Sequence, residues 1–533
     1  RIAIIKLFYG MTITSAQLAG QLKAGGHVPL VVMFKRQAFL LADKLPDPDY
    51  ELGDTPMTGF MVNKDGVSAF ESSVWKKTSE QELNNLKAVL AEFRPDAIGI
   101  STLSWGMTLA GRISEFLRKH FTVPLLWGGT GPTLEPDRSM QFADLVCVGE
   151  GENILDEIGQ RLNGRQPLDG INGTWCRLPD GSIQKNPKRP VSNLEEIAVP
   201  AWESSHMVLI DGDTVERNFS DTSAYRDRSY QMMTQRGCPF ACSFCVESFY
   251  QKEFGKKDSL RRMSPQKAIR ELKHAKDVLG YETVTFMDDV FTVNPRWLTE
   301  FCELYKKEIG LPFFCYTYPG VHDFEMLRML EDAGCHAITI GVQSGSQRIL
   351  NEVFDRRTRV DRIVESIEDI VRSGIPAATF DMIPATKFDT EQDLKDTFEL
   401  LLKIPKELDT TFYGQMTYYP NYPIMDKFRD DSLTAKAGGL TPDDYAYYIK
   451  LCNLTRTDMP VDQIVAISKD EKYRLDHNLL DPMLKDDSIL KANFGLLVDV
   501  GIERRARTEH RATPPGAGSS AQHPHAHSAG SRP

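Results

Sequence analysis

Short apolar runs alternate with segments of helical spacing in two separate stretches of the chain. In the first stretch, strand-like runs lie at residues 1–7, 28–34, 97–101, 123–127 and 146–148, and helical spacing covers 14–24, 83–93 and 108–120. Such alternation is typical of a parallel sheet with helices on both faces. We therefore expect a doubly wound α/β domain over about residues 1–165.

The second stretch repeats the alternation more regularly. Strands are predicted at 231–234, 283–287, 313–316, 337–341, 377–382 and 414–418, with helices at 265–279, 295–309, 324–333, 347–352, 360–373 and 391–404. Six β/α units in roughly 200 residues favour a partial barrel of parallel strands over residues 226–430. Sites in such folds lie at the C-terminal ends of the strands.

The remaining segments carry weaker patterns. Residues 166–225 are predicted to be a linker with one hairpin, formed by 173–177 and 183–186 around the turn Pro179-Asp180-Gly181. Residues 431–502 are predicted to be a small helical region, and 503–533, rich in Pro, Gly, Ser and His, to be a disordered tail. His523, His525 and His527 are interpreted as part of that tail and not as a metal site.

Composition narrows the classes of function. The 533 residues are 41% hydrophobic and 26% charged, with a net charge of −11 and no long Lys/Arg block, which argues against a nucleic-acid partner. No apolar run is long enough for a membrane span, and residues 1–8 read as a strand rather than a signal peptide. Nine cysteines, gathered at only one place, favour a reducing cytoplasm and a metal site over disulfides.

That place is a loop just after the first strand of the second stretch. Cys238, Cys242 and Cys245 have the spacing C-x3-C-x2-C, so three thiolates can converge on one iron–sulfur cluster. Buried free cysteines or a three-thiolate zinc site are the alternatives. Structural zinc normally takes four ligands, and no second cysteine pair is nearby.

Residues 236–245, Arg-Gly-Cys-Pro-Phe-Ala-Cys-Ser-Phe-Cys, closely resemble the signature of the radical S-adenosylmethionine (SAM) superfamily. The resemblance implies a [4Fe-4S] cluster on the three cysteines and Phe244 against the adenine of SAM. Residues 286–292 and 341–346 are similar to the second- and fourth-strand motifs of that family, which points to Asp289, Gln343 and Ser344 as SAM contacts. Gln343 replaces a Glu common in relatives, and residues 381–386 lack the glycines of the usual sixth-strand motif.

The first domain carries three motifs at predicted strand ends: Ser101 and Leu103 in Ser-x-Leu, the pair Gly128-Gly129, and residues 149–152, Gly-Glu-Gly-Glu. Together they resemble the Rossmann-like cobalamin-binding domain that precedes many radical SAM enzymes. The resemblance implies cobalamin contacts from Ser101, Leu103, Gly128, Gly129 and Glu150. No Asp-x-His-x-x-Gly motif is present, so cobalt would lack a His ligand from the loop at residues 8–12. A related domain that binds nothing is the alternative.

Further polar residues follow predicted strands of the barrel. Asp288 and Asp289 are paired carboxylates, either for a ribose contact or proton transfer, or for capping a loop. A set of tyrosines is expected either to line a substrate cavity or to pack in the ordinary way: Tyr316, Tyr318, Tyr418, Tyr419 and Tyr422. Asp289 and Tyr316 are the candidate catalytic residues.

The joint resemblance is to the cobalamin-dependent, methyltransferase-like class of radical SAM enzymes. It implies reductive cleavage of SAM to a 5′-deoxyadenosyl radical and methylation of an unactivated carbon, or phosphorus, of a small-molecule metabolite. It also implies an electron donor such as flavodoxin or ferredoxin. A non-methylating cyclase or rearrangement enzyme with the same cofactors is the alternative. A methylthiotransferase would carry more cysteines in its first domain, which here holds only Cys147, and a non-enzymatic carrier would not need the barrel motifs.

Overall fold

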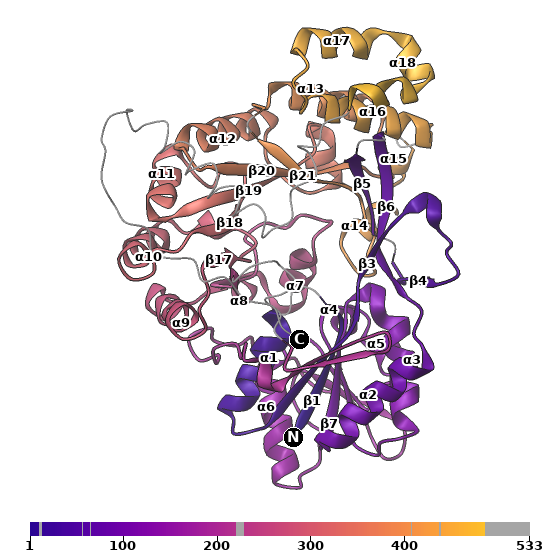
Figure 1. Cartoon of the computed structure of the whole chain (residues 1–533), viewed down its shortest axis with the longest axis vertical. Coiled ribbons are helices and arrows are strands. Elements are labelled where there is room, and N and C mark those ends of the chain that lie inside the picture. The colour runs from indigo at the N-terminus through magenta and orange to yellow at the C-terminus, as the bar shows by residue number, and fades with distance from the viewer. Residues whose placement is uncertain are drawn as a thin grey trace, which may run out of the picture.

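The computed structural model of this chain describes residues 1–9, 13–55, 57–63, 66–219, 229–406, 408–435 and 439–484. Two large sheets organise the described part, one in each half of the molecule (Figure 1). The predicted tail at 503–533 and its histidines lie outside the described residues, as does most of the loop at 8–12.

The first sheet runs in the order β11-β10-β9-β8-β7-β1-β2-β12-β13. Its strands are β1 (Ile2–Tyr9), β2 (Pro29–Arg36), β7 (Ala97–Ser101), β8 (Leu125–Gly128), β9 (Leu145–Cys147), β10 (Thr174–Arg177), β11 (Ile183–Lys185), β12 (Met207–Asp211) and β13 (Thr214–Arg217). All pairings from β9 through β12 are parallel. Chain order reverses between β1 and β7, where doubly wound sheets place their ligands.

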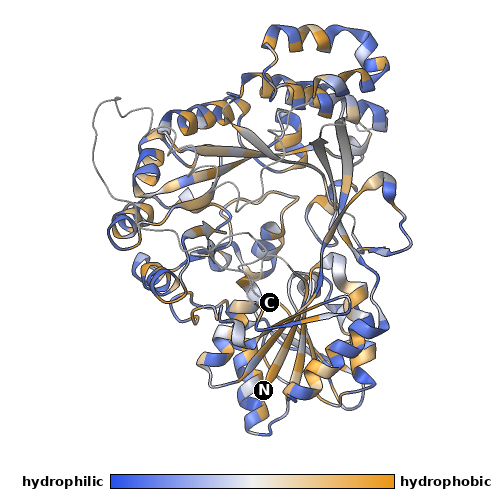
Figure 2. Ribbon diagram, in the orientation of Figure 1, coloured by the Kyte–Doolittle hydropathy of each residue, from blue (hydrophilic) through white to orange (hydrophobic). Residues whose placement is uncertain are grey.

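Helices cover both faces of this sheet, as predicted. Even-numbered residues of β1, such as Ile4, pack in one cluster with α1 (Ile13–Ala24) and α6 (Glu152–Asn163). Odd-numbered residues, such as Ile5, pack in another with α2 (Glu80–Phe93) and α3 (Met107–Arg118). Figure 2 shows the apolar strands between helices whose outer faces are polar. The hydrophobic pattern of the first stretch therefore correctly predicted a sheet that is buried on both faces by helices.

The segment predicted to be a linker contributes strands to both edges of the first sheet. The predicted hairpin is present, with Trp175 opposite Lys185, and it pairs with β9 at one edge. At the other edge β12 pairs in parallel with β2, because the continuous apolar run 207–210 is buried like an inner strand. We propose that the first structural unit extends to about residue 217 instead of ending at 165.

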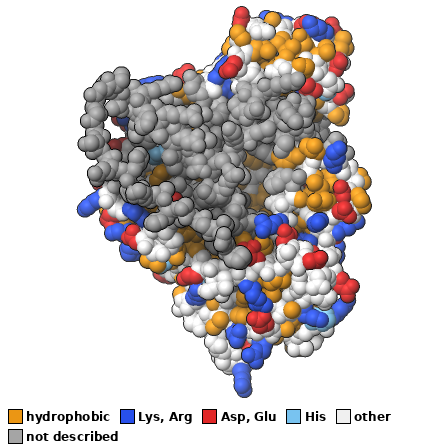
Figure 3. Space-filling model, in the orientation of Figure 1, with side chains coloured by type: hydrophobic (Ala, Val, Ile, Leu, Met, Phe, Trp, Pro, Cys, Tyr) orange, Lys and Arg blue, Asp and Glu red, His pale blue; other side chains and the backbone are white. Residues whose placement is uncertain are grey.

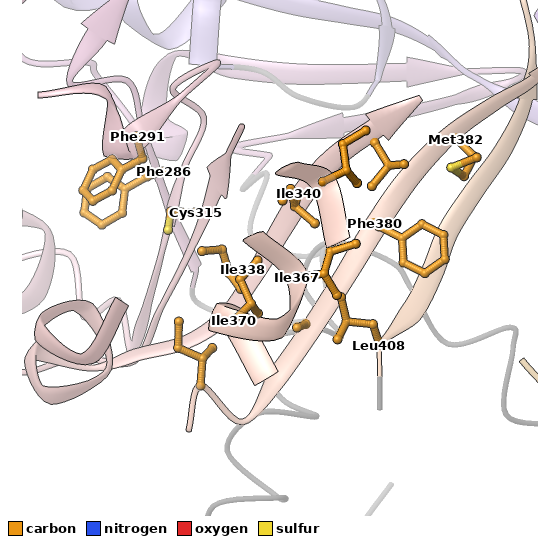
Figure 4. Packing of buried hydrophobic residues seen from close by; sticks show 14 of the residues in the cluster. Phe286, Phe291, Cys315, Ile338, Ile340, Ile367, Ile370, Phe380, Met382 and Leu408 are labelled. Carbon is orange, nitrogen blue, oxygen red and sulfur yellow. The ribbon is translucent and has the colours of Figure 1, made fainter. Parts of the chain in front are cut away.

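The second sheet contains the six predicted parallel strands. They are β14 (Ser229–Met232), β17 (Thr283–Phe286), β18 (Phe313–Thr317), β19 (Cys335–Gln343), β20 (Ala377–Ala385) and β21 (Asp409–Gln415). The helices between them are α9 (Pro265–Asp277), α10 (Pro295–Glu308), α11 (Phe324–Ala333), α12 (Val360–Ser373) and α13 (Glu391–Lys403). Figure 4 shows Ile338 and Ile340 of β19 packed against Ile367 and Ile370 of α12.

A segment of the first stretch extends the barrel sheet. Four strands between β2 and α2 were not predicted: β3 (Ala38–Leu41), β4 (Tyr50–Leu52), β5 (Thr58–Asn63) and β6 (Gly66–Lys76). β5 and β6 form a hairpin, and β5 pairs antiparallel with β21. The chain therefore crosses between the two sheets near its start and covers the outer edge of the last barrel strand.

Short helices follow the barrel: α14 (Ile424–Lys427), α15 (Asp431–Thr434), α16 (Pro442–Leu454), α17 (Val461–Lys469), α18 (Glu471–Leu475) and the 3-10 turn η7 (His477–Met483). α16 lies against α13, where Arg456 donates to the carbonyls of Leu401 and Ile404. Among the described helices none is long and apolar enough to cross a membrane. Where side chains are coloured in Figure 3, basic and acidic groups are interspersed on the visible face.

Candidate active site and cofactor cavity

The three cysteines lie on a loop at the C-terminal end of β14. Two short strands, β15 (Gln235–Arg236) and β16 (Arg261–Arg262), pair antiparallel and close its base. Gly237 begins the loop with φ +83°, and a Cβ there would lie 2.1 Å from the Ser259 carbonyl oxygen, so only glycine fits. Cys245 caps α7 (Val246–Phe254). The loop is thereby tied at its base and at its exit.

The cysteine side chains share one small apolar cluster with Val290 and Tyr318. Burial raises the pKa of the Cys238 thiol to about 12 and that of Cys245 further still. A bare thiolate is disfavoured here, so deprotonated sulfurs need a cationic partner. Among the described residues no three His, Cys, Asp or Glu side chains converge on a single metal ion. A cluster does not require this, because each thiolate binds a different iron.

The two aspartates after β17 have separate roles. Asp288 is fully buried and accepts hydrogen bonds from the backbone N–H groups of Thr234 and Gln235 and from Arg262, so it caps the loop before the cysteines. Asp289 keeps solvent contact and faces Cys238 and Cys245. The surrounding protein and Asp288 raise the pKa of Asp289 to about 6. Asp289 is thus the carboxylate available to a ligand.

A second carboxyl, which the sequence did not single out, lies beside Asp289. Glu247 is on the first turn of α7, and burial, followed by the charge of Asp289, raises its pKa to about 8. Its position two residues after Cys245 was the only available signal. The cysteine loop therefore faces two carboxyl groups that hold protons more tightly than in water.

The predicted SAM contacts are only partly brought together. Phe244 is half-buried on the cysteine loop, with its ring edge-on to Phe354 at 4.8 Å. Gln343 ends β19 with φ +74°, at a register shift against β20. Ser344 is buried, and its hydroxyl accepts from the Ser346 N–H, beside Thr397 of α13. Phe244 and Gln343 are partly exposed, so their SAM contacts stay predictions, whereas the Ser344 side chain serves the loop.

The tyrosines divide in the same way. Tyr316 is half-buried on β18. The side chains of Phe313 and Cys315 point to one face of this strand and pack in the main barrel core, and successive side chains of a strand point to opposite faces. Tyr316 therefore lies on the opposite face of β18, toward the barrel interior. Tyr318 stacks on Phe240 of the cysteine loop at 3.7 Å between ring centroids. The remaining three follow β21, where the Tyr418 hydroxyl accepts from the Lys387 N–H and Tyr419 packs on Tyr422.

A cavity of about 320 Å³ lies at the C-terminal edge of the first sheet and reaches the cysteine loop. It spans the point where strand order reverses, with Ile4 of β1 and Gly99 of β7 in its lining. The predicted cobalamin residues Ser101, Gly128, Gly129 and Glu150 line it. Leu103 is 40% exposed and is outside that lining, so its predicted contact stays a prediction.

Glycine keeps the floor of the cavity open. Gly129 has φ +104°, and a Cβ there would lie 2.6 Å from the Thr102 carbonyl oxygen. Gly149 has φ +101°, and its Cβ would lie 2.8 Å from the Phe254 ring. Backbone without side chains along a strand edge suits the close approach of a large flat ligand. These residues fit a corrin ring.

Glu150 lines the cavity but is engaged by two arginines. It accepts hydrogen bonds from Arg236 at 2.9 Å and from Arg261 at 2.6 Å, and Glu152 pairs with Arg236 as well. Despite burial, these hydrogen bonds and charges lower the pKa of Glu150 to about 2. Arg236 and Arg261 belong to β15 and β16, so Glu150 ties the first sheet to the base of the cysteine loop.

The segment at residues 189–200, here called the strap, closes one side of the cavity and was not anticipated. Lys267 of α9 holds it by donating to the carbonyls of Leu194, Glu195 and Ile197 at 2.6–3.0 Å. Lys267 is buried, and the three carbonyls act as its partners, since lysine is almost never buried without them. This contact could not be predicted, because no local sequence pattern links Lys267 to the strap, which lies about 70 residues earlier in the chain.

Both domains match known families. Residues 77–159 match the B12 binding domain and residues 232–401 match the radical SAM superfamily. The second match contains the cysteine loop, the strands β17 to β20 and most of α13. The first contains Ser101, Gly128, Gly129 and Glu150.

Curated relatives match this chain at low identity. An uncharacterized methyltransferase of Pyrococcus horikoshii is 26% identical over 64% of this chain and 70% of its own length. The cytidylyl-2-hydroxyethylphosphonate methyltransferase of Streptomyces wedmorensis is 26% identical over 52% of this chain and 56% of its own length. The anaerobic magnesium-protoporphyrin IX monomethyl ester cyclase of Rubrivivax gelatinosus is 21% identical over 66% and 61%. The chain thus spans little more than half the length of some relatives.

A solved structure agrees on the fold. The cobalamin-dependent SAM radical enzyme OxsB with aqua-cobalamin bound aligns with a TM-score of 0.60 and 15% identity, covering 95% of this chain and 76% of that one. The cofactors implied by the two domains are a [4Fe-4S] cluster, SAM and cobalamin. The chain is a cobalamin-dependent radical SAM enzyme, with a B12-binding domain in front of a radical SAM domain.

Proposed function

We propose that this enzyme methylates an unactivated carbon, or phosphorus, of a small-molecule metabolite. The observation that carries the proposal is the continuity between the two sites. Arg236, Gly237, Glu247 and Tyr250 of the cysteine-loop region line the same cavity as the glycines of the first sheet. Methyl transfer needs a methyl carrier next to the centre where a substrate radical forms. Two of the three relatives named above are methyltransferases.

The cofactors would supply a 5′-deoxyadenosyl radical and a transferable methyl group. The chain supplies position and shielding. Cys238, Cys242 and Cys245 would hold the cluster, and Phe244 and Gln343 would contact SAM. Asp289 is close enough to the cysteines to affect their charge and is open to solvent, so it can accept a hydrogen bond from a bound hydroxyl. We infer flavodoxin or ferredoxin as the electron donor.

Isotope labelling tests the proposal. The anaerobically reconstituted enzyme is incubated with dithionite, SAM carrying a trideuterated methyl group and a small-molecule extract. Methylation predicts metabolites heavier by one labelled methyl group, with S-adenosylhomocysteine and 5′-deoxyadenosine formed in equal amounts. A changed metabolite without label, together with 5′-deoxyadenosine alone, would contradict methylation and favour the cyclase alternative, which the similarity to the Rubrivivax enzyme supports.

A Cys242→Ala enzyme is the control for this experiment. It lacks one of the three thiolates that would hold the cluster, so any labelled product that persists in this variant does not arise from radical chemistry. Absence of 5′-deoxyadenosine from the unmodified enzyme would argue against the radical assignment itself.

A further inference from the structure

A buried arginine lies beside the middle cysteine. Arg356 follows the π-helical turn η6 (Ile349–Val353) and is 4% exposed. Its Nη1 donates to the Cys242 sulfur at 3.8 Å, and its Nη2 donates to the Gly341 carbonyl. Its guanidinium carbon lies 3.8 Å from the centre of the Tyr318 ring. The Nε–H is buried without a hydrogen-bond partner among the described residues.

Part of this environment is explained by structure. The register of β19 against β20 shifts between Gly341 and Gln343, which leaves a carbonyl that Arg356 satisfies. Tyr318 in turn stacks on Phe240, so guanidinium, tyrosine and phenylalanine form one stack against the cysteine loop. These contacts fix the guanidinium in place and leave its Nη1 directed at the Cys242 sulfur.

The cysteine loop does not need this side chain for docking. The Ser243 N–H donates to the Phe354 carbonyl at 2.9 Å, and the Ser243 hydroxyl donates to the Val353 carbonyl at 2.5 Å. On the other side, the Ile424 N–H donates to the Ser243 carbonyl at 2.8 Å. Backbone groups and one serine therefore hold the loop against the segment that carries Arg356, so the arginine can be changed without undocking the loop.

The charges around the cysteines are unequal. The carboxyl groups of Asp289 and Glu247 lie on the side of Cys238 and Cys245. Arg356 instead places the positive charge of its guanidinium beside the Cys242 sulfur. Hydrogen bonds to the ligand sulfurs are among the factors that set the potential of an iron–sulfur cluster, and charged donors in a low-dielectric site act strongly.

We propose that Arg356 is a positioning residue that raises the reduction potential of the cluster through Cys242. Reduction adds a negative charge next to this sulfur, and the fixed guanidinium stabilises that charge. The inference goes beyond the proposed function, because it concerns how readily the cluster accepts an electron, whatever the substrate is.

The test measures the potential directly. Full-length enzyme, reconstituted with iron, sulfide and cobalamin, is titrated anaerobically and followed by the cluster EPR signal without SAM. Arg356→Gln and Arg356→Met remove the charge, Arg356→Lys keeps it, and Arg359→Gln changes an arginine on the same segment that is 79% exposed. We expect the reduced-to-oxidised ratio at a fixed potential to fall about tenfold in the neutral variants, which is about 59 mV for one electron.

The lysine variant should shift less than the neutral variants, and Arg359→Gln should not shift. Four irons per chain are expected in every variant. An unchanged potential in either neutral variant that retains four irons would overturn the proposal. Loss of iron from both neutral variants would also overturn it, because Arg356 would then serve only assembly. Since the readout is a potential, its outcome is independent of whether the enzyme methylates anything.

Discussion

The cavity of the first sheet and the cysteine loop both lie at C-terminal edges of parallel strands, but they keep their shape by different means. The cavity is built from backbone in regular strands, with Gly129 and Gly149 leaving space. The cysteine loop is irregular and depends on side chains from distant segments, such as Glu150 on Arg236 and Asp288 under Thr234. From this difference we expect the cavity to be damaged by substitutions that add side-chain atoms. We expect the cysteine loop to be damaged by substitutions that remove them.

The largest expected effect comes from removing a cluster ligand. Cys242→Ala leaves two thiolates, so we expect the reconstituted enzyme to lose nearly all of its cluster iron and to form no 5′-deoxyadenosine. Iron analysis and product chromatography measure this. Cys176→Ala is the control, since Cys176 lies in β10, the second strand of the first sheet, and does not line the cavity. A Cys242→Ala enzyme that still cleaves SAM would refute the role assigned to the loop.

Adding one carbon to the cavity should have the next largest effect. Gly129→Ala forces a residue with φ +104° and a Cβ 2.6 Å from the Thr102 carbonyl oxygen. We expect about 1–3 kcal/mol of strain with a comparable cost from overpacking, and cobalamin affinity at least about a hundredfold lower in a spectroscopic titration.

The matched control for that substitution is Gly181→Ala. Gly181 has φ +84° but nothing within 4 Å of its Cβ position, so it tests backbone strain alone. Equal loss of cobalamin affinity in both variants would show that crowding at Gly129 does not cause the weaker binding.

Glu150 should be sensitive to removal and to acid. Its pKa is about 2 in the folded chain against an ordinary 4.5, which corresponds to roughly 3 kcal/mol of stability at neutral pH. Because the folded pKa is the lower one, this stability is present above about pH 5 and is lost as the pH falls toward 2.

Glu150→Gln should therefore be less stable than the unmodified enzyme at pH 7, with a difference that shrinks below about pH 5. Denaturant unfolding across that range measures it. A difference that stays constant with pH would show that the carboxylate charge does not hold the two arginines.

The smallest effect is expected at the strap. Lys267→Met removes the donor to three carbonyls, which costs about 1–3 kcal/mol locally, and cobalamin should dissociate several-fold faster. Lys276→Met on the same helix removes a single hydrogen bond to the Ile309 carbonyl, far from the cavity, and should leave the rate unchanged. Equal dissociation rates in both variants would mean that the strap does not retain the cofactor.

Local signals predicted the regular elements well. α11 and α12 begin and end at the predicted residues, because Asp323 caps the first and Gly334 and Gly374 end the two helices in the left-handed conformation. The six barrel strands and the doubly wound sheet follow from hydrophobic periodicity, and the fold class is confirmed. Cys238, Cys242 and Cys245 could be proposed as cluster ligands because their spacing is local.

What the sequence missed depends on pairing across long separations. The strand pair β5–β21 joins residues about 350 apart, and Arg356 reaches Cys242 from 114 positions away. The hydrogen bonds from two barrel arginines to the Glu150 carboxylate were not foreseen, while the predicted cobalamin contact of Glu150 stays a prediction. No periodicity reports such contacts, since each partner looks like an ordinary polar or strand residue in its own segment.

The hairpin of β5 and β6 also imposes an order on biosynthesis. Its last residue is Lys76, whereas its partner strand begins at Asp409. At about 5–20 residues per second, the hairpin leaves the ribosome roughly 15 to 70 s before β21 exists. During that interval its outer strand presents unpaired N–H and C=O groups. Until the barrel is nearly complete, this strand edge is therefore open to pairing with other chains.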